Sequence, residues 1–323
     1  MIELHRMHVG RGIADGPVTL FPVWIDVPAV TGIDWRPNAV AYREFDGGAS
    51  VSTLTAQAVG LRPAIALDGD LAEGGWQTRM VARSVLLGAG QTAKLPVLCV
   101  EEGRWGGLSD DLVGRARRAT PAVRAATYRA GDVQQDVWAR VREFEQLAGG
   151  AGASASRSLA HHLDALDALG DGLAVWQPTG LESLGARPTV IDGQRGVIVG
   201  IGGRIVGAEL FASTVALKSR WAGIIDAARL DARRVSPFAT PAEQARRFAR
   251  RLEKLAIGRD VHAPGGLSVA LETRDERYAG RGIALSSPAA ASEAPGSTAL
   301  NGDERMLHLG VVDLAHPMFA LAA

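Results

Sequence analysis

RGVIVGIGGRIVGAELF, residues 195–211, decides the fold class, because its glycine cluster fits two different structures. In a dinucleotide-binding fold, a glycine-rich turn follows a strand and opens a helix. Here a second β-type run follows the glycines. The pattern therefore predicts an antiparallel hairpin, with Gly202 or Gly203 at positive φ, where a side chain would clash.

Upstream of this hairpin, the first hundred residues have the pattern of short strands. Runs such as VTLFPVWIDV, AVAYREF and KLPVLCVEE are β-branched or alternate in polarity, and clusters of Gly, Pro and Asp separate them. This spacing predicts an antiparallel β-sandwich or a strongly bent sheet.

From Ser109 onward the pattern becomes helical, with one apolar stripe formed by Val133, Val137, Val141 and Phe144. After the hairpin, helices are expected near 213–230 and 241–256, and strands again at the end of the chain. This order predicts an α+β fold, not a regular βαβ alternation. We expect one integrated unit made of a β-rich lobe, a helical segment and a second, smaller lobe of strands and helices, at residues 1–108, 109–170 and 171–323.

Composition excludes several classes of protein. The chain has 323 residues, of which 47% are hydrophobic, enough to bury a sizeable core. It has no run of eighteen apolar residues and no secretory signal, so we expect no membrane association and a cytoplasmic location. The formal net charge is +0, which argues against general nucleic-acid binding. Locally, residues 243–259 hold six basic and two acidic residues, which predicts a helix with a basic face.

The stretch LPVLCVEEGRWGG, residues 95–107, contains the only cysteine of the chain, two adjacent glutamates and an arginine. In an alternating strand Glu101 continues the apolar face of Cys99 and Val97, and a desolvated carboxylate there must meet an arginine or lie at a cavity mouth. Glu209 poses the same problem in the hairpin. Arg79 and Arg104 are the natural partners, because a guanidinium grips a carboxylate or a phosphate through two parallel hydrogen bonds.

Cys99 and Arg104 suggest a cysteine-phosphatase loop, but only four residues separate them, where those enzymes have five. The cysteine lies in an apolar strand, where burial raises the thiol pKa. We therefore interpret Cys99 as a core residue. Gly103 is expected to break the strand alternation, so that Arg104 and Trp105 turn towards Glu101.

Several motifs together resemble the ARG-and-rhodanese-phosphatase-associated protein domain family, a bacterial family of unknown function. They are GDLAEGGWQTRMVARSVLLGAG, LPVLCVEEGRW, VQQDVW and the hairpin strand GGRIVGAELF, and the resemblance runs from about Gly16 to about Asp313. Trp76 departs from the family pattern, which has a lysine there. The residues that match the pattern are Gln77, Arg79, Cys99, Glu101, Gly103, Arg104, Trp105, Gln135, Trp138, Glu209 and Phe211. The resemblance implies a link to ADP-ribosylglycohydrolases by genomic context, and hence to NAD or ADP-ribose metabolism.

Two functions remain open. In the first, the protein binds or processes an ADP-ribose-like, NAD-derived or other phosphorylated small molecule, with a glutamate as acid or base and arginines on the phosphates. In the second, it is a non-catalytic interaction or scaffold protein, and the same charges form a buried polar network. The sequence indicates no metal site, and it names neither a cofactor nor an oligomeric state. The candidate catalytic residues are Glu101 and Glu209, and the candidate ligand-binding residues are Gln77, Arg79, Arg104, Trp105, Gln135 and Trp138.

Overall fold

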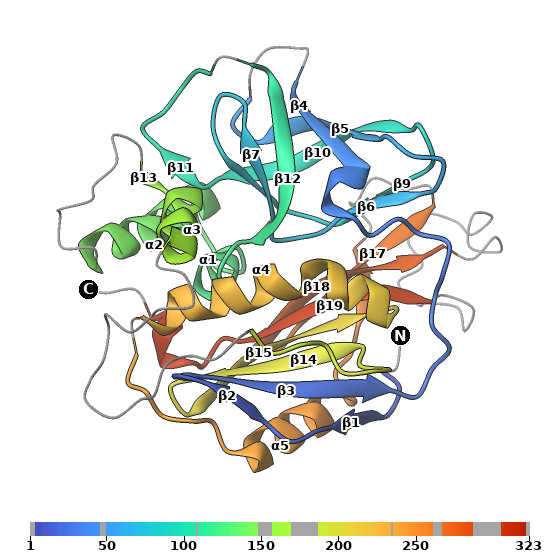
Figure 1. Ribbon diagram of the computed structural model, residues 1–323, viewed down its shortest axis with the longest axis vertical. Coiled ribbons are helices and arrows are strands. Elements are labelled where there is room, and N and C mark those ends of the chain that lie inside the picture. The colour runs from blue at the N-terminus through green and yellow to red at the C-terminus, as the bar shows by residue number, and fades with distance from the viewer. Residues whose placement is uncertain are drawn as a thin grey trace.

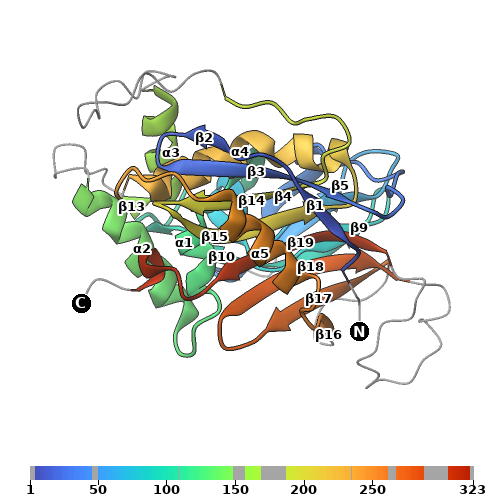
Figure 2. The same cartoon turned by 90° about the horizontal axis from the view of Figure 1, so that it is seen from below.

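The computed structural model describes residues 4–45, 50–107, 109–147, 157–168, 187–233, 235–260, 267–286 and 305–320. They form a closed β-barrel stacked above a large antiparallel sheet, with helices between the two and at one side (Figures 1 and 2). The α+β class is confirmed. No helix among these residues is long and apolar enough to cross a membrane.

The barrel has the strand order β10-β5-β4-β12-β7-β8. The bent sheet predicted from the first hundred residues therefore closes on itself. Leu54, Val81, Leu95 and Val97 belong to its packed interior. The strands are β4 (Val40–Glu44), β5 (Thr53–Ala58), β7 (Asp70–Gly74), β8 (Arg79–Val81), β10 (Thr92–Cys99) and β12 (Asp111–Arg118), and a separate pair, β6 (Ala64–Ala66) and β9 (Val85–Leu87), lies beside them.

The large sheet has the order β1-β3-β14-β15-β19-β18-β17-β16, with β2 paired to β3. Of its N-terminal strands, β3 pairs with the hairpin strand β14, for example through Val23 and Gly196. The strands are β1 (Met7–Val9), β2 (Ile13–Asp15), β3 (Val18–Ile25), β14 (Gly196–Ile201), β15 (Arg204–Phe211), β16 (Gly258–Asp260), β17 (Ser268–Arg274), β18 (Tyr278–Leu285) and β19 (Met306–Asp313). The chain thus starts in the sheet, builds the barrel and returns to the sheet.

The fold-deciding hairpin is confirmed. Strands β14 and β15 pair antiparallel on either side of a two-residue turn, in which Gly202 has φ of 59° and Gly203 has φ of 85°. Both glycines adopt the left-handed backbone conformation that a tight hairpin turn requires. A strand follows the glycines, so the dinucleotide-fold alternative is excluded for this segment.

Two helices cover opposite faces of the sheet. Helix α4 (Thr214–Ala232) packs on the face towards the barrel, and α5 (Ala242–Leu252) packs on the outer face (Figures 1 and 2). Phe248 and Leu252 of α5 are buried against that face. Three more helices, α1 (Pro121–Ala126), α2 (Val133–Leu147) and α3 (Leu159–Ala168), pack beside the barrel, and α3 follows a short strand β13 (Arg157–Ser158) that pairs with β11 (Glu101–Glu102).

The helical prediction from residue 109 onward is wrong for its first part. Asp111–Arg118 forms strand β12, which closes the barrel between β4 and β7. The strand is irregular, since its register shifts between Gly114 and Arg118 and Ala116 has φ of 60°. Its arginine-rich sequence lacks the apolar alternation of an ordinary strand, which explains the error. Two segments have a composition that predicts connecting chain: the linker-like GGAGASAS at 149–156 lies outside the described residues, as do residues 287–304 of the loop expected at 286–304.

Candidate functional site

Glu101 and Arg104 meet as predicted at one end of the barrel. Gly103 has φ of 98°, which ends the strand and turns the chain back. The Arg104 Nε donates to Glu101 Oε1 at 2.8 Å, and Nη2 donates to Oε2 at 2.7 Å. This two-pronged ion pair gives the buried Glu101 carboxylate the partner that its desolvation requires.

The remaining donors of Arg104 are also occupied. Its Nη1 donates to the carbonyl oxygens of Gly75 at 2.9 Å and Gly106 at 3.2 Å, and its Nη2 reaches that of Gly74 at 3.4 Å. A guanidinium has five N–H donors, so these bonds and the two to Glu101 use all of them. Arg104 is therefore a clip that holds two glycine-rich turns together, and the anion-binding role predicted for it does not fit this geometry.

Two tryptophans flank this clip at the protein surface. Trp105 is 52% exposed, and its ring meets that of Trp76 edge to face at a centroid distance of 5.7 Å. The Trp76 indole N–H donates to Asp110 Oδ1 at 2.9 Å. Trp76, at the position of the family lysine, thus packs against the predicted ligand residue Trp105.

Gln77, Arg79 and Cys99 lie behind the clip, inside the barrel end. The Cys99 Sγ lies 3.3 Å from Gln77 Oε1 and 3.1 Å from the Glu101 carbonyl oxygen, and its single S–H is shared between these two acceptors. Burial raises the pKa of this thiol, and the opposing effects of the Glu101 hydrogen bond, Arg79 and the half-buried Trp138 do not offset it. Cys99 is therefore a protonated core thiol. Arg79 is fully buried, and the one hydrogen bond of its side chain among the described residues goes to the Ser50 carbonyl.

Gln135 does not join this cluster. Its side chain is exposed, and the adjacent Gln134 makes the contact instead. Gln134 Oε1 accepts from the Cys99 backbone N–H at 2.9 Å, and its Nε2 donates to the Cys99 carbonyl at 2.7 Å. Both glutamines lie in the first turn of α2, so the orientation of this helix decides which of them faces the barrel.

Glu209 lies elsewhere, between the sheet and the barrel, so the two predicted catalytic glutamates do not share a site. It accepts hydrogen bonds from Arg124 of α1, from Arg118 Nη2 of β12 at 3.4 Å and from His308 Nε2 of β19 at 2.6 Å. The cavity beside it is only about 30 Å³, room for about one water molecule. Glu209 therefore belongs to a sealed network that ties barrel strand β12 and helix α1 to the sheet.

The network predicts how stability changes with pH. Burial alone would raise the Glu209 pKa, but the charges of Arg124 and Arg118 outweigh it and hold the pKa well below its ordinary value. A depressed pKa means that this stability is complete above the unfolded-state pKa, about 4.3, and is lost as pH falls through the folded-state pKa. We expect thermal melts between pH 7 and pH 3 to fall less steeply for Glu209→Gln than for the wild type. Parallel profiles would contradict the assignment.

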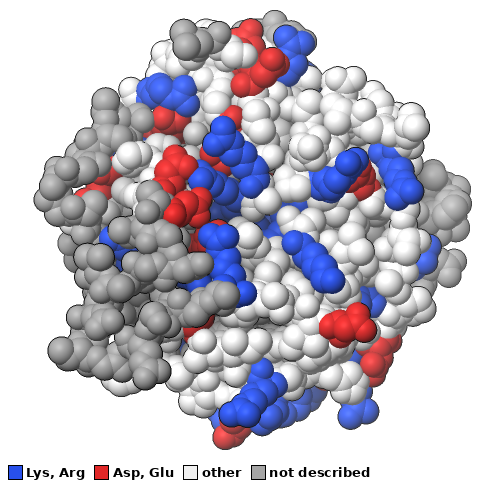
Figure 3. Space-filling view, in the orientation of Figure 1, with Lys and Arg blue, Asp and Glu red and all other residues white. Residues whose placement is uncertain are grey.

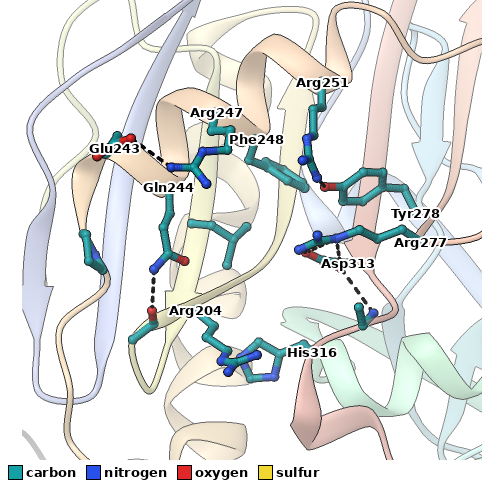
Figure 4. A pocket seen from close by; sticks show the side chains of 14 residues that line it. Arg204, Glu243, Gln244, Arg247, Phe248, Arg251, Arg277, Tyr278, Asp313 and His316 are labelled. Atoms are coloured by element: carbon teal, nitrogen blue, oxygen red, sulfur yellow. Dashed lines mark hydrogen bonds and ion pairs between the residues drawn. The ribbon is translucent and has the colours of Figure 1, made fainter.

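A large open pocket lies on the outer face of the sheet, beneath α5 (Figure 4). We call this cavity of about 490 Å³ the arginine pocket, because Arg204, Arg247, Arg251 and Arg277 line it. Arg204 is the first residue of strand β15, successive turns of α5 supply Arg247 and Arg251, and the β17–β18 turn supplies Arg277. Figure 3 shows basic side chains gathered at the lower edge of the molecule, where α5 lies.

The four arginines differ in their partners. Arg277 makes a two-pronged pair with Asp313, at 2.9 Å and 2.6 Å, and Arg247 pairs with Glu243 of α5 at 2.8 Å. Arg251 donates to the neutral hydroxyl of Tyr278 at 3.0 Å. Among the described residues, neither Arg251 nor Arg204 has a carboxylate within ion-pair distance. The pocket therefore carries an excess of two positive charges from its arginines, Glu243 and Asp313.

The other polar groups of the pocket are already engaged. His316 Nδ1 accepts from the Met318 N–H, and Nε2 lies 3.2 Å from the Ile201 carbonyl. Burial lowers the His316 pKa, so the ring is neutral and Nε2 carries its proton. The Asp313 carboxylate is held by Arg277. This arrangement suits binding of an anion better than proton transfer. No metal-binding group of three or more His, Cys, Asp or Glu occurs in the described ranges.

The arginine pocket was not predicted as a site, although one signal pointed to it. The basic run at 243–259 covers most of α5, the turn after it and the start of β16, and Arg247 and Arg251 are its arginines that line the pocket. Arg246 and Arg250 of the same helix are exposed and lie outside the lining. Arg204 at the start of β15 and Arg277 in the β17–β18 turn are distant in the chain from α5, so sequence spacing alone could not assemble the site.

Comparison with known proteins gives one result. No curated protein and no solved structure shows significant similarity to the chain. One family does match, described as the ARG and Rhodanese-Phosphatase-superfamily-associated Protein domain, over residues 6–300. This match includes the barrel, α5, most of the sheet and all the predicted site residues. The chain therefore belongs to the ARG and Rhodanese-Phosphatase-superfamily-associated Protein domain family.

Proposed function

We propose that the protein binds a phosphorylated small molecule in the arginine pocket. The observation that carries the proposal is the pair Arg204 and Arg251, which line the pocket without a carboxylate partner among the described residues. A guanidinium presents its donors in a planar fork that matches a phosphate, and a pocket of about 490 Å³ lies in the range of small-molecule sites.

ADP-ribose, NAD-derived compounds and other phosphorylated metabolites are the first candidates, because the family resemblance implies them. The geometry supports binding more than chemistry. Glu101, expected as an acid or base, is held by Arg104, and Glu209 is sealed in its own network. In the alternative hypothesis of a non-catalytic scaffold protein, buried charges form a polar network. The Glu209 network is such a network, but it joins parts of this chain to each other and does not require a partner protein.

Removing either unpaired arginine should weaken phosphate binding. Each charge-assisted hydrogen bond is worth about 1.5–3 kcal/mol, so Arg204→Ala and Arg251→Ala should each lower the affinity for inorganic pyrophosphate at least about tenfold. Isothermal titration calorimetry at low salt measures this directly. Arg250→Ala is the matched control, because Arg250 lies on the same helix but outside the pocket, and it should change the affinity less than about twofold.

The proposal fails if wild-type protein shows no pyrophosphate binding at millimolar concentration. It also fails if Arg250→Ala weakens binding as much as Arg251→Ala, because the effect would then come from the general charge of α5. Thermal melts of all variants check that the fold persists, as expected for substitutions of partly exposed side chains.

A further inference from the structure

The exposed face of helix α5 carries more positive charge than the arginine pocket uses. Residues 243–254 hold five cations against two carboxylates, Glu243 and Glu253. Glu243 already pairs with Arg247, and Glu253 Oε1 accepts from the Met7 backbone N–H at 2.7 Å. All five cations are exposed, and they are Arg246, Arg247, Arg250, Arg251 and Lys254. Helix α5 and the turn after it therefore present a net positive surface that extends beyond the pocket.

Three of these cations lie outside the arginine pocket, and we call them the cationic row: Arg246, Arg250 and Lys254. Their side chains make no hydrogen bond or ion pair with any residue that the structure describes. They recur every four residues, so they project from one stripe, with successive members about 6 Å apart along the helix axis. Lys254 also lines a depression with Asp275 and Glu276, which Arg251 and Arg277 keep net positive. A row of separated cations fits successive phosphates of a chain, whereas the pocket fits one phosphate group or two joined ones.

An exposed aromatic ring lies at the N-terminal end of the same helix. Phe238, in the segment that leads into α5, is 66% exposed. It lies beside the β14–β15 turn, because a Cβ atom added to Gly203 would be only 3.4 Å from the Phe238 Cβ. Gln244, in the first turn of α5, donates to the Gly203 carbonyl at 3.1 Å. Phe238 and the start of α5 thus meet at this turn, and the cationic row runs from there to the other end of the helix.

Cations combined with an exposed aromatic ring favour one class of polyanion. Proteins that bind single-stranded nucleic acid hold the phosphates with basic side chains and stack the bases on aromatic rings. A lipid surface fits less well, because Phe248 and Leu252 of α5 are buried against the sheet and its outward face has no apolar side chain to enter a bilayer. An acidic protein surface would account for the cations alone and would leave the ring of Phe238 without a role.

We propose that α5 binds single-stranded nucleic acid, with successive phosphates on the cationic row and a base stacked on Phe238. Contacts to phosphates and to the faces of bases carry no sequence information, so the binding is independent of sequence. The chain as a whole has a formal net charge of +0, which confines the attraction to this local surface. The proposal is a second function, because neither the row nor Phe238 belongs to the lining of the arginine pocket.

Fluorescence anisotropy with a labelled oligothymidine of about twelve nucleotides, without terminal phosphates, tests this at a series of salt concentrations. The double variant Arg246→Ala/Arg250→Ala should bind at least about tenfold more weakly than the wild type at low salt. It should also reduce the slope of log affinity against log salt by about 1.4, which corresponds to two lost phosphate contacts. Phe238→Ala should weaken binding at least about fivefold with an unchanged slope, because stacking releases no counterions. Lys218→Ala is the control, since Lys218 is an exposed cation of α4, on the other face of the sheet, and it should change neither quantity.

Several results would overturn the proposal. Wild-type protein that does not bind the oligonucleotide at low salt would refute it, as would an equal loss of affinity in Lys218→Ala. If Phe238→Ala has no effect and an oligoglutamate of the same charge competes as well as unlabelled oligothymidine, the surface serves an acidic protein instead. Pyrophosphate titration remains the separate test of the arginine pocket, so oligonucleotide binding through the cationic row without pyrophosphate binding would support this inference and refute the proposed function.

Discussion

Replacing Glu209 with glutamine should lower the free energy of unfolding by about 3–5 kcal/mol, the range seen when one partner of a buried ion pair is removed. Three groups lose this charged partner at once, namely Arg118, Arg124 and His308, while Arg118 keeps Asp70 and Arg124 keeps Asp68 as carboxylate partners. His308 is fully buried, and its Nε2–H would then face an amide whose orientation must also serve the two guanidinium groups. Few single substitutions in this chain should cost more.

Denaturation with urea, at pH 7, measures the change. Glu243→Gln is the matched control, because Glu243 is an exposed glutamate that pairs within α5, and it should cost less than about 1 kcal/mol. A loss below about 1 kcal/mol for Glu209→Gln would show that the network does not hold the barrel to the sheet.

The second large effect is expected at the barrel end. Arg104→Leu removes the partner of buried Glu101 and the donor to three backbone carbonyls, so it should cost about 3 kcal/mol or more of stability. Because all five donors of Arg104 are used within the protein, pyrophosphate affinity should stay within about twofold of the wild type.

A loss of stability together with an unchanged pyrophosphate affinity would show that Arg104 has a structural role and does not bind the ligand. Arg43→Leu is a suitable control, because Arg43 makes an exposed ion pair with Asp111 on the same barrel and should cost little stability. If Arg104→Leu instead left stability intact and abolished phosphate binding, the barrel end would be the binding site and the assignment to the arginine pocket would be wrong.

Local sequence patterns predicted the parts of the fold that depend on neighbouring residues. The glycines at 202–203 need positive φ, and the strand after them excludes a helix, so the hairpin followed from the sequence. Gly103 placed Arg104 against Glu101 for the same reason, three residues apart in the chain. In both cases the deciding interaction is short in sequence and has a clear steric cause.

The parts that sequence patterns missed depend on long-range pairing. Strand β12 closes the barrel by pairing with β4 and β7. Its arginine-rich sequence fits this position because Arg118 donates a hydrogen bond to Glu209, which is distant in the chain. Barrel closure is a property of six strands, and no one segment encodes it. Alternation correctly placed Glu209 on a buried face, but could not show that this face meets α1 and the barrel.

The arginine pocket could not be predicted from the sequence for the same reason, because it too depends on long-range pairing. Its four arginines are separated by up to 73 positions, from Arg204 to Arg277, and only the antiparallel order of β15, β19 and β18 brings them beneath α5. By contrast, the predicted residues clustered around Glu101 because three motifs converge on one barrel end. That convergence stabilises the barrel. The arginines without a carboxylate partner, Arg204 and Arg251, lie instead on the opposite side of the sheet from the Glu209 network.

The most direct test is a crystal structure of the wild-type protein with ADP. We predict density for the two phosphates between α5 and the sheet, within hydrogen-bond distance of Arg204 and Arg251, with the barrel end unchanged. Phosphate density beside Trp105 and Arg104, with the arginine pocket empty, would contradict the proposed function.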